Sequence, residues 1–110
     1  MNKYTYTVEK LTNTIECLAT HPGDIRKRVT AAYQYFYVLN TDDFPPKYQK
    51  DWEQIIKELT KYEPILDLNG NVIIGKVKNT MRHMHNKTAS KIAKKIYTLY
   101  WAVSENKQYM

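Results

Sequence analysis

The stretch HPGDIRKRVTAAYQYFYVLN, residues 21 to 40, decides the fold class. Pro22 and Gly23 break any helix that reaches them, and Asp24 is suited to cap a new helix that starts directly afterwards. The apolar residues that follow are spaced alternately four and three apart, and they fall within about 80° of arc at about 100° per residue. They are Ile25, Val29, Ala32, Phe36 and Leu39. This pattern predicts an amphipathic helix that packs in a bundle.

The same apolar spacing recurs on both sides of this helix. It runs through residues 4 to 18 before the break, through residues 48 to 62 after the boundary NTDDFPP, and through residues 89 to 103 near the end of the sequence. Thr88 is a permitted cap for the last of these helices. A chain of 110 residues is long enough for one domain. The sequence therefore predicts an all-α fold, a compact bundle of four or five helices in a single domain over 1–110.

Residues 64 to 84 allow two interpretations. Asn69-Gly70 between two apolar arms is typical of a type I′ hairpin turn, which would give a short hairpin near 65–75. Against this, Ile73, Val77 and Met81 keep helical spacing through Gly75. A lone two-stranded hairpin has little to support it in a helical domain. We therefore expect a loop over 64–71 and a short fourth helix from about Asn71 to Met84.

Positive charge is concentrated in one third of the chain. The net charge is +6, yet residues 68 to 104 carry seven cations and no aspartate or glutamate. A merely solvated helix face normally mixes both signs, because oppositely charged side chains four residues apart stabilise each other. A one-signed segment produces a directional field, which attracts anionic partners.

The last predicted helix presents these cations on one side. Lys87, Lys91, Lys94 and Lys95 fall within about 100° of arc opposite the apolar stripe. Trp101 lies near the edge of this basic face, where an indole could stack on an unpaired base. In a purely structural interpretation, these lysines form a solvated helix surface. In a functional interpretation, they form a binding face for nucleic-acid backbone or for an acidic protein.

Three further cations could extend this face. Arg82 precedes the last helix, and Arg26, Lys27 and Arg28 occupy the first turn of the helix after Asp24, where the helix dipole favours acids. The triplet joins the basic face only if the two helices lie side by side. Alternatively, Arg28 lies along the edge of the core with only its charged end in water.

The tyrosines of the second helix indicate a possible protein contact. Tyr33, Tyr35 and Tyr37 lie beside or away from its apolar stripe, so this helix is apolar on more than one face. We expect it to be the central helix, since helices that are apolar all round are buried. The alternative is a homo-oligomer contact through this helix. As a protein-interaction module, an inhibitor or immunity-type protein, the chain would use these tyrosines as its apolar anchor.

Several classes of function find no support in the sequence. We find no catalytic constellation and no phosphate-cradling glycine motif, so we expect a non-enzymatic protein without a cofactor. His83 and His85 point apart in a helix, so we expect no metal site. Cys17 is the one cysteine, and no apolar segment approaches the ~20 residues that span a bilayer. These observations predict a cytoplasmic protein with no membrane partner.

The order of sequence features adds one resemblance. ECLATHPGDIRKRV, then DDFPPKYQKDWEQIIKELT, and later MRHMHNKTASKIAKKIY occur within residues 16 to 97. In this pattern the chain resembles small uncharacterised helical proteins from bacteria and their mobile elements. The resemblance implies a helical fold and a bacterial or phage setting, and it carries no motif for an activity.

Overall fold

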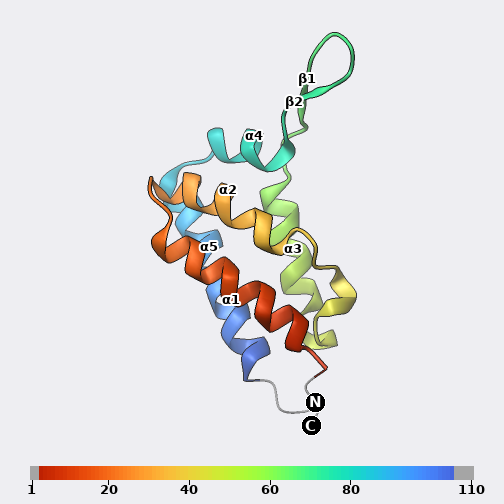
Figure 1. The fold of residues 1–110 in the computed structure, drawn as a ribbon, viewed down its shortest axis with the longest axis vertical. Helices are drawn as coiled ribbons and strands as arrows, with labels where there is room; N and C mark the ends of the chain where they lie inside the picture. Colours follow the sequence, from red (N-terminus) through yellow and green to blue (C-terminus); the bar gives the residue numbers. More distant parts are fainter. Residues whose placement is uncertain (1–2, 106–110) are drawn as a thin grey trace.

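A computed structural model describes residues 3–105, and it confirms the all-α bundle (Figure 1). The helices are α1 (Thr5–Thr20), α2 (Ile25–Phe36), α3 (Gln49–Leu59), α4 (Lys76–Arg82) and α5 (Asn86–Ser104). Two short 3-10 turns, Thr41–Asp43 and Pro46–Tyr48, form the connection from α2 to α3. Two short strands, β1 (Ile65–Leu66) and β2 (Val72–Ile74), precede α4.

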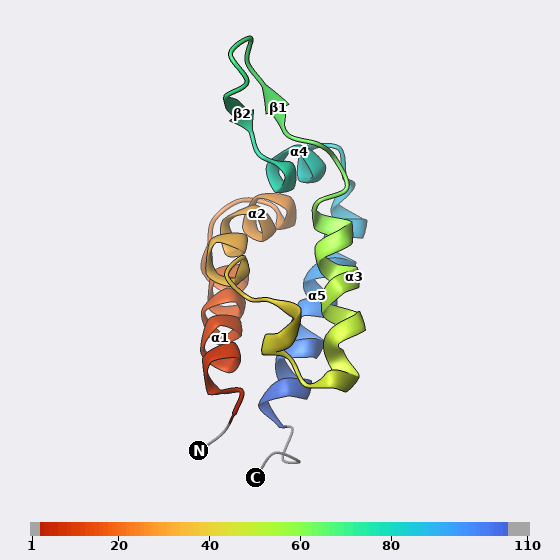
Figure 2. The ribbon, with the colours of Figure 1, turned by 90° about the vertical axis from the view of Figure 1, so that its right-hand side faces the viewer.

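The four longer helices form two layers. Figure 2 shows α1 and α2 on one side and α3 and α5 on the other, with α4 across one end. Between the layers, Trp52 of α3 is buried with its ring 4.6 Å from that of Phe44 and 5.7 Å from that of Phe36. Leu11 of α1 and Ile96 of α5 complete the same core. The apolar stripes of the sequence therefore face one another between the layers.

The break at residues 21 to 24 forms as predicted. Gly23 has φ +104°, which side chains with a Cβ rarely adopt, and α1 ends at Thr20 just before it. The carboxylate of Asp24 accepts a hydrogen bond of 3.1 Å from the backbone N–H of Lys27 and caps α2. This cap fixes the direction in which α2 returns along α1.

The prediction for residues 64–84 was wrong in its preferred form. Asn71 does not begin a helix, because β1 and β2 pair as an antiparallel hairpin and α4 begins only at Lys76. The turn also differs from type I′, since no residue other than glycine has a positive φ in the described part of the chain, while Gly70 has φ +82°. The backbone N–H of Gly70 donates to Asp67 O at 3.1 Å, and that of Asp67 donates to Asn71 O at 2.8 Å. The loop therefore contains three residues, with glycine in the left-handed position.

Polar contacts support this hairpin at both ends. At the turn, the carboxylate of Asp67 accepts hydrogen bonds of 2.9 Å from the backbone N–H groups of Asn69 and Asn71, and these bonds lower its pKa. At the base, the side-chain amide of Asn79 donates to Glu63 O at 2.7 Å. Because Asn79 is buried in α4, this bond fastens the base of the hairpin to the bundle.

The hairpin projects away from the bundle and exposes apolar side chains (Figures 1 and 2). Leu68 at its tip is fully exposed, and Ile73 on β2 is 63% exposed. Leu66 and Val72 are also more than half exposed. Exposed apolar groups that cluster in this way are typical of contact surfaces.

Helix α2 is central, as predicted, because it packs against α1, α4 and α5. Tyr33 is half-buried and lies edge-on to Phe36 at 5.3 Å. Tyr35 and Tyr37 instead reach solvent, with 37% and 60% of their surface exposed. Helix α5 begins at Asn86, slightly before Thr88.

Candidate functional site

The cations predicted on α5 lie in solvent along one side of the helix. We call Lys87, Lys91, Lys94 and Lys95 the lysine face; all four are exposed, while the apolar stripe of α5 is buried. Lys87 and Lys94 are two turns apart, which is about 10 Å along the helix axis. Trp101 is two further turns along, on nearly the same line, and is 46% exposed.

Helix α3 brings acids to one edge of this face. The ammonium of Lys95 lies 2.9 Å from Oε1 and 3.3 Å from Oε2 of Glu58. Partial burial raises the pKa of Glu58, but the hydrogen bonds from Lys95 and Gln54 outweigh it, so the pKa lies below its usual value. Glu58 therefore stays ionised at neutral pH and offsets the charge of Lys95.

A groove between α3 and α5 lies beside the same edge. Lys91, Lys94 and Lys95 line one wall, and Asp51 lies among the lining residues from α3. Leu99 contributes an apolar part of the lining. The segment that lacks acids in sequence is thus flanked by acids in space, and the sequence could not show this.

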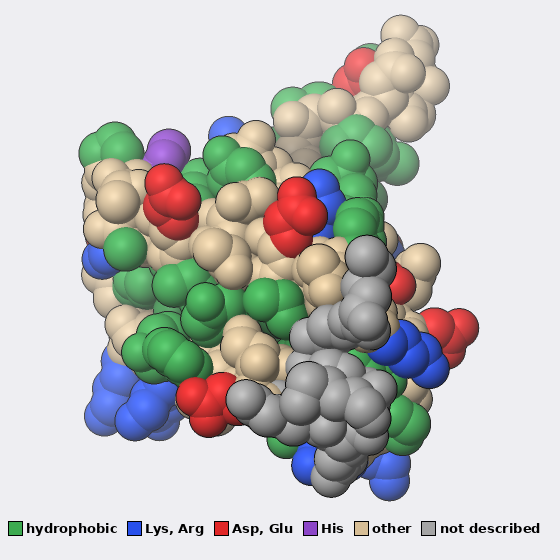
Figure 3. Space-filling view, turned by 60° about the horizontal axis from the view of Figure 1, so that its bottom comes forward, with side chains coloured by type: hydrophobic (Ala, Val, Ile, Leu, Met, Phe, Trp, Pro, Cys, Tyr) green, Lys and Arg blue, Asp and Glu red, His purple; other side chains and the backbone are tan. Residues whose placement is uncertain are grey.

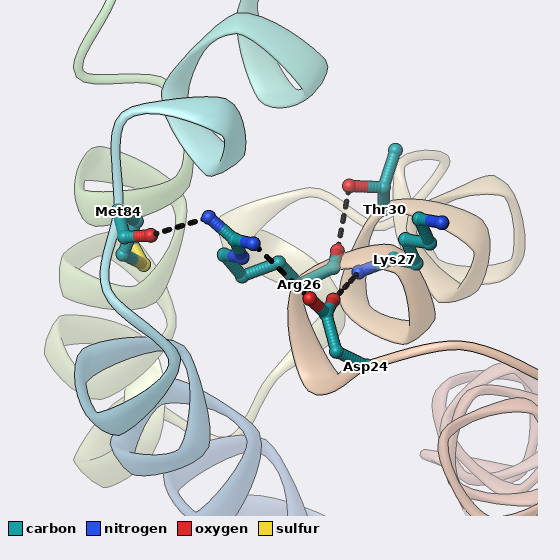
Figure 4. Close-up of polar contacts among 5 residues, drawn as sticks. All are labelled: Asp24, Arg26, Lys27, Thr30 and Met84. Atoms are coloured by element: carbon teal, nitrogen blue, oxygen red, sulfur yellow. Dashed lines mark hydrogen bonds and ion pairs between the residues drawn. The ribbon is translucent and has the colours of Figure 1, made fainter.

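The arginines of the triplet bind backbone carbonyls. Arg26 donates to Met84 O at 3.2 Å and pairs with the carboxylate of Asp24 at 3.1 Å (Figure 4). Arg28 donates to Leu18 O at 3.1 Å, in the last turn of α1. A cation near the C-terminal end of a helix interacts favourably with its dipole. These contacts give structural roles to Arg26 and Arg28, two of the three cations in the first turn of α2.

Lys27 and Arg82 lie in a second groove, between α2 and α4, which we call the α2–α4 groove. Its volume is about 610 Å³, and its lining includes Arg26 and Met81. Lys78, one turn before Arg82 on α4, is also part of the lining. We did not single out Lys78 from the sequence, although its position four residues before Arg82 in the acid-free segment was a usable signal.

The predicted cations therefore separate into three places. The lysine face lies on α5, Lys27 and Arg82 reach the α2–α4 groove, and Arg28 turns to the end of α1. Arg26 connects two of these places, since it lines the groove and binds the carbonyl of Met84, just before α5.

The surroundings of His83 and Cys17 suit a structural role for both side chains. The ring of His83 stacks on Tyr62 at 4.3 Å, and its Nδ1 lies 2.8 Å from Asn79 O. Burial raises the pKa of the Cys17 thiol, which disfavours the reactive thiolate. Within residues 3–105, no three His, Cys, Asp or Glu side chains are grouped so that they could hold a metal ion. No helix in this range has the length and apolar character needed to cross a bilayer.

Comparison of the chain with protein-family models, curated proteins and solved structures returned no significant match. The fold defines the class to which the chain can be assigned: a small all-α bundle with one projecting β-hairpin. Function must be inferred from its surfaces.

Proposed function

We propose that this protein is a non-enzymatic basic module that binds nucleic-acid backbone through the lysine face of α5. One observation carries the proposal. Lys87, Lys91 and Lys94 are exposed on one side of a helix, and none of them forms an ion pair with any residue that the structure describes. Unpaired lysines in a row keep their full charge for an external anion.

The distribution of charge over the surface supports this interpretation. Figure 3 shows one group of Lys and Arg side chains at a corner of the face in view, and further basic and acidic side chains dispersed over the rest of it. The three unpaired lysines follow one another at four and three residues, or about 6 and 4.5 Å along the helix axis. Phosphates follow each other at about 3.4 Å of rise along one strand of a duplex, so neighbouring lysines would meet nearby phosphates.

The contacts would not read sequence strongly. Lysine meets a phosphate as a point charge, and contacts to phosphate position a protein without distinguishing bases. Trp101 adds a surface on which an unpaired base could stack. We place this activity in the cytoplasm, and the resemblance in sequence implies a bacterial or phage setting.

The test is binding of the purified protein to single- and double-stranded DNA and RNA at two salt concentrations. Three lysine contacts give a slope of about −2.7 in log affinity against log salt, so duplex affinity should fall about 40-fold when salt rises fourfold. No binding at about 50 mM salt would refute the proposal.

Charge-reversal variants test whether binding depends on the lysine face or only on the net charge of the protein. Lys91→Glu/Lys94→Glu should abolish binding, whereas Lys57→Glu/Lys61→Glu, two exposed lysines at the end of α3 and just beyond it, should weaken it much less. Both variants change the net charge equally. Equal losses would mean that total charge, rather than the lysine face, controls binding.

The second candidate is a protein-interaction module, an inhibitor or immunity-type protein with an acidic partner. The apolar hairpin favours it, because Leu68 and Ile73 are exposed there, and Tyr35 and Tyr37 are exposed on α2. Under this proposal Leu68→Ser/Ile73→Ser or Tyr35→Ala/Tyr37→Ala would remove a partner captured from cells, while polyanion binding would be unchanged. Self-association through α2 would appear as a dimer in sedimentation that Tyr35→Ala/Tyr37→Ala disrupts.

A further inference from the structure

The α2–α4 groove combines cations with an apolar wall. Lys27 comes from the first turn of α2, and Lys78 and Arg82 come from successive turns of α4. Met81 and Ala31 line the groove between these cations. Its volume of about 610 Å³ lies within the range of small-molecule sites, about 300 to 1,000 Å³.

The charge of the groove is strongly positive. Lys27, Lys78 and Arg82 are exposed, and none of them has an ion-pair partner between residues 3 and 105. Asp24 is the one acid among the lining residues, and its carboxylate already accepts from the backbone N–H of Lys27 and from Arg26. The negative charge of Asp24 is therefore engaged, and the three other cations are not compensated.

Two features of the groove cost stability in the absence of a ligand. Lys78 and Arg82 are like charges four residues apart on one helix, an arrangement that destabilises a helix. Arg26 lines the groove, and its Nε is buried without a hydrogen-bond partner in the described part of the chain. Buried donors are normally satisfied. An anion near these groups would relieve the repulsion.

We propose that the α2–α4 groove binds a nucleotide. Lys27, Lys78 and Arg82 hold its phosphate, and the base lies against the apolar wall at Ala31, which is partly exposed, whereas Met81 of the same wall is only 2% exposed. Three cations in the lining of one groove suit a phosphate, because ammonium and guanidinium groups are its usual partners. The apolar wall suits a flat ring and leaves a bare inorganic anion without a contact there.

The nucleotide has two possible sources with the same chemistry. It is either a free mononucleotide or an unpaired nucleotide of a strand that also contacts the lysine face. The second source rests on the proposed function, and the first does not. Arg26 makes the second source geometrically reasonable, since it lines the groove and binds Met84 O three residues before Lys87.

Calorimetric titration with AMP and with adenosine tests the groove directly. We expect AMP to bind, and adenosine to bind at least about tenfold more weakly, because one charged hydrogen bond is worth about a factor of ten. Lys78→Ala/Arg82→Ala should lower the affinity for AMP on the order of 100-fold. Lys57→Ala/Lys61→Ala, two exposed lysines outside the groove and outside the lysine face, form the matched control and should leave it unchanged.

Further measurements keep the test independent of folding and of the proposed function. Lys27→Ala removes a groove cation from a different helix and should also weaken the binding of AMP. Circular dichroism checks that each variant is folded. Single-stranded oligothymidylate distinguishes the two sources. One outcome is that AMP fails to bind while Lys78→Ala/Arg82→Ala lowers the affinity for the oligonucleotide more than it lowers the affinity for a duplex. In that case the groove takes its nucleotide from a strand.

Other outcomes overturn the inference. Equal affinity for AMP and adenosine would show that the cations do not hold a phosphate. If Lys78→Ala/Arg82→Ala changes neither the affinity for AMP nor the affinity for the oligonucleotide, the groove takes no nucleotide. AMP binding without any duplex binding would instead retain this inference and refute the proposed function of the lysine face.

Discussion

Replacing Glu58 with glutamine is the most direct test of how the structure changes the lysine face. Lys95 is exposed, but its ammonium is held 2.9 Å from the carboxylate of Glu58. In the wild type we therefore count three lysines that are free to meet phosphates, and in Glu58→Gln we count four. The variant should bind nucleic acid more tightly and depend more steeply on salt.

The expected size follows from counterion release. Each phosphate contact adds about 0.9 to the slope of log affinity against log salt. Three contacts give about 2.7 and four give about 3.6, so a fourfold rise in salt lowers affinity about 40-fold in the wild type and about 150-fold in the variant. Fluorescence anisotropy with a labelled duplex at several salt concentrations measures both slopes.

The substitution should leave the fold intact. Glu58 and Lys95 are partly exposed, and exposed ion pairs contribute about 0–1 kcal/mol to stability. Glu53→Gln is the matched control, because Glu53 is an exposed acid on the same helix, and its nearest polar partner is the hydroxyl of Thr41 at 3.5 Å. An unchanged slope in Glu58→Gln, or an equal rise in Glu53→Gln, would refute the assignment of Lys95 as a neutralised member of the lysine face.

Three other predictions concern the fold. Trp52→Ala should lower the free energy of unfolding by about 3–5 kcal/mol in urea denaturation, because Trp52 is buried against two aromatic rings. Asn79→Ala should cost about 1 kcal/mol by losing its bond to Glu63 O, and hydrogen exchange should accelerate in the hairpin before it does in the helices. The N–H of Lys27, together with Arg26, lowers the pKa of Asp24, so its cap stabilises the protein above the unfolded pKa and is lost as pH falls through the lower folded value. Asp24→Asn should flatten this acid limb of stability in denaturation curves taken at a series of pH values.

The helices could be predicted from sequence because their signals are local. Ile25, Val29 and Phe36 repeat at helical spacing, and the break at Pro22-Gly23 lies between two such repeats. Val29 and Phe36 are buried in the two-layer core and Ile25 is partly buried against it, which confirms that the apolar period alone located the bundle. Start positions were less certain, as α5 shows, because neighbouring polar residues can all cap a helix.

The hairpin was the less favoured of the two interpretations because its support is not local. A two-stranded hairpin is marginal by itself, and sequence reasoning had no means of placing Asn79 beside Glu63. The helical spacing of Val77 and Met81 was interpreted correctly. Extending the helix back through Gly75 to Asn71 was wrong, because Gly75 is extended and precedes the first helical residue. Asp67, whose side chain orders the turn, was the local clue.

The charge pattern was only partly predictable for the same reason. An acid-free segment in sequence can still pack against an acidic helix, and α3 supplies Glu58 and Asp51 at the edge of the lysine face. Conversely, cations that are distant in sequence can line one groove, as Lys27 and Lys78 do in the α2–α4 groove. Packing thus lowers the positive charge of the lysine face at Lys95. It also brings cations together in the α2–α4 groove, a surface that the sequence did not distinguish.

The bond from Arg26 to Met84 links the two basic surfaces. It holds the start of α2, which lines the α2–α4 groove, against the connection between α4 and α5 that precedes the lysine face in the chain. From Lys87 to Trp101 the helix extends about 21 Å, which corresponds to about six nucleotides at about 3.4 Å each. A strand with one unpaired nucleotide in the groove would therefore run along α5 towards Trp101, and the groove would fix where on the strand the lysines make contact.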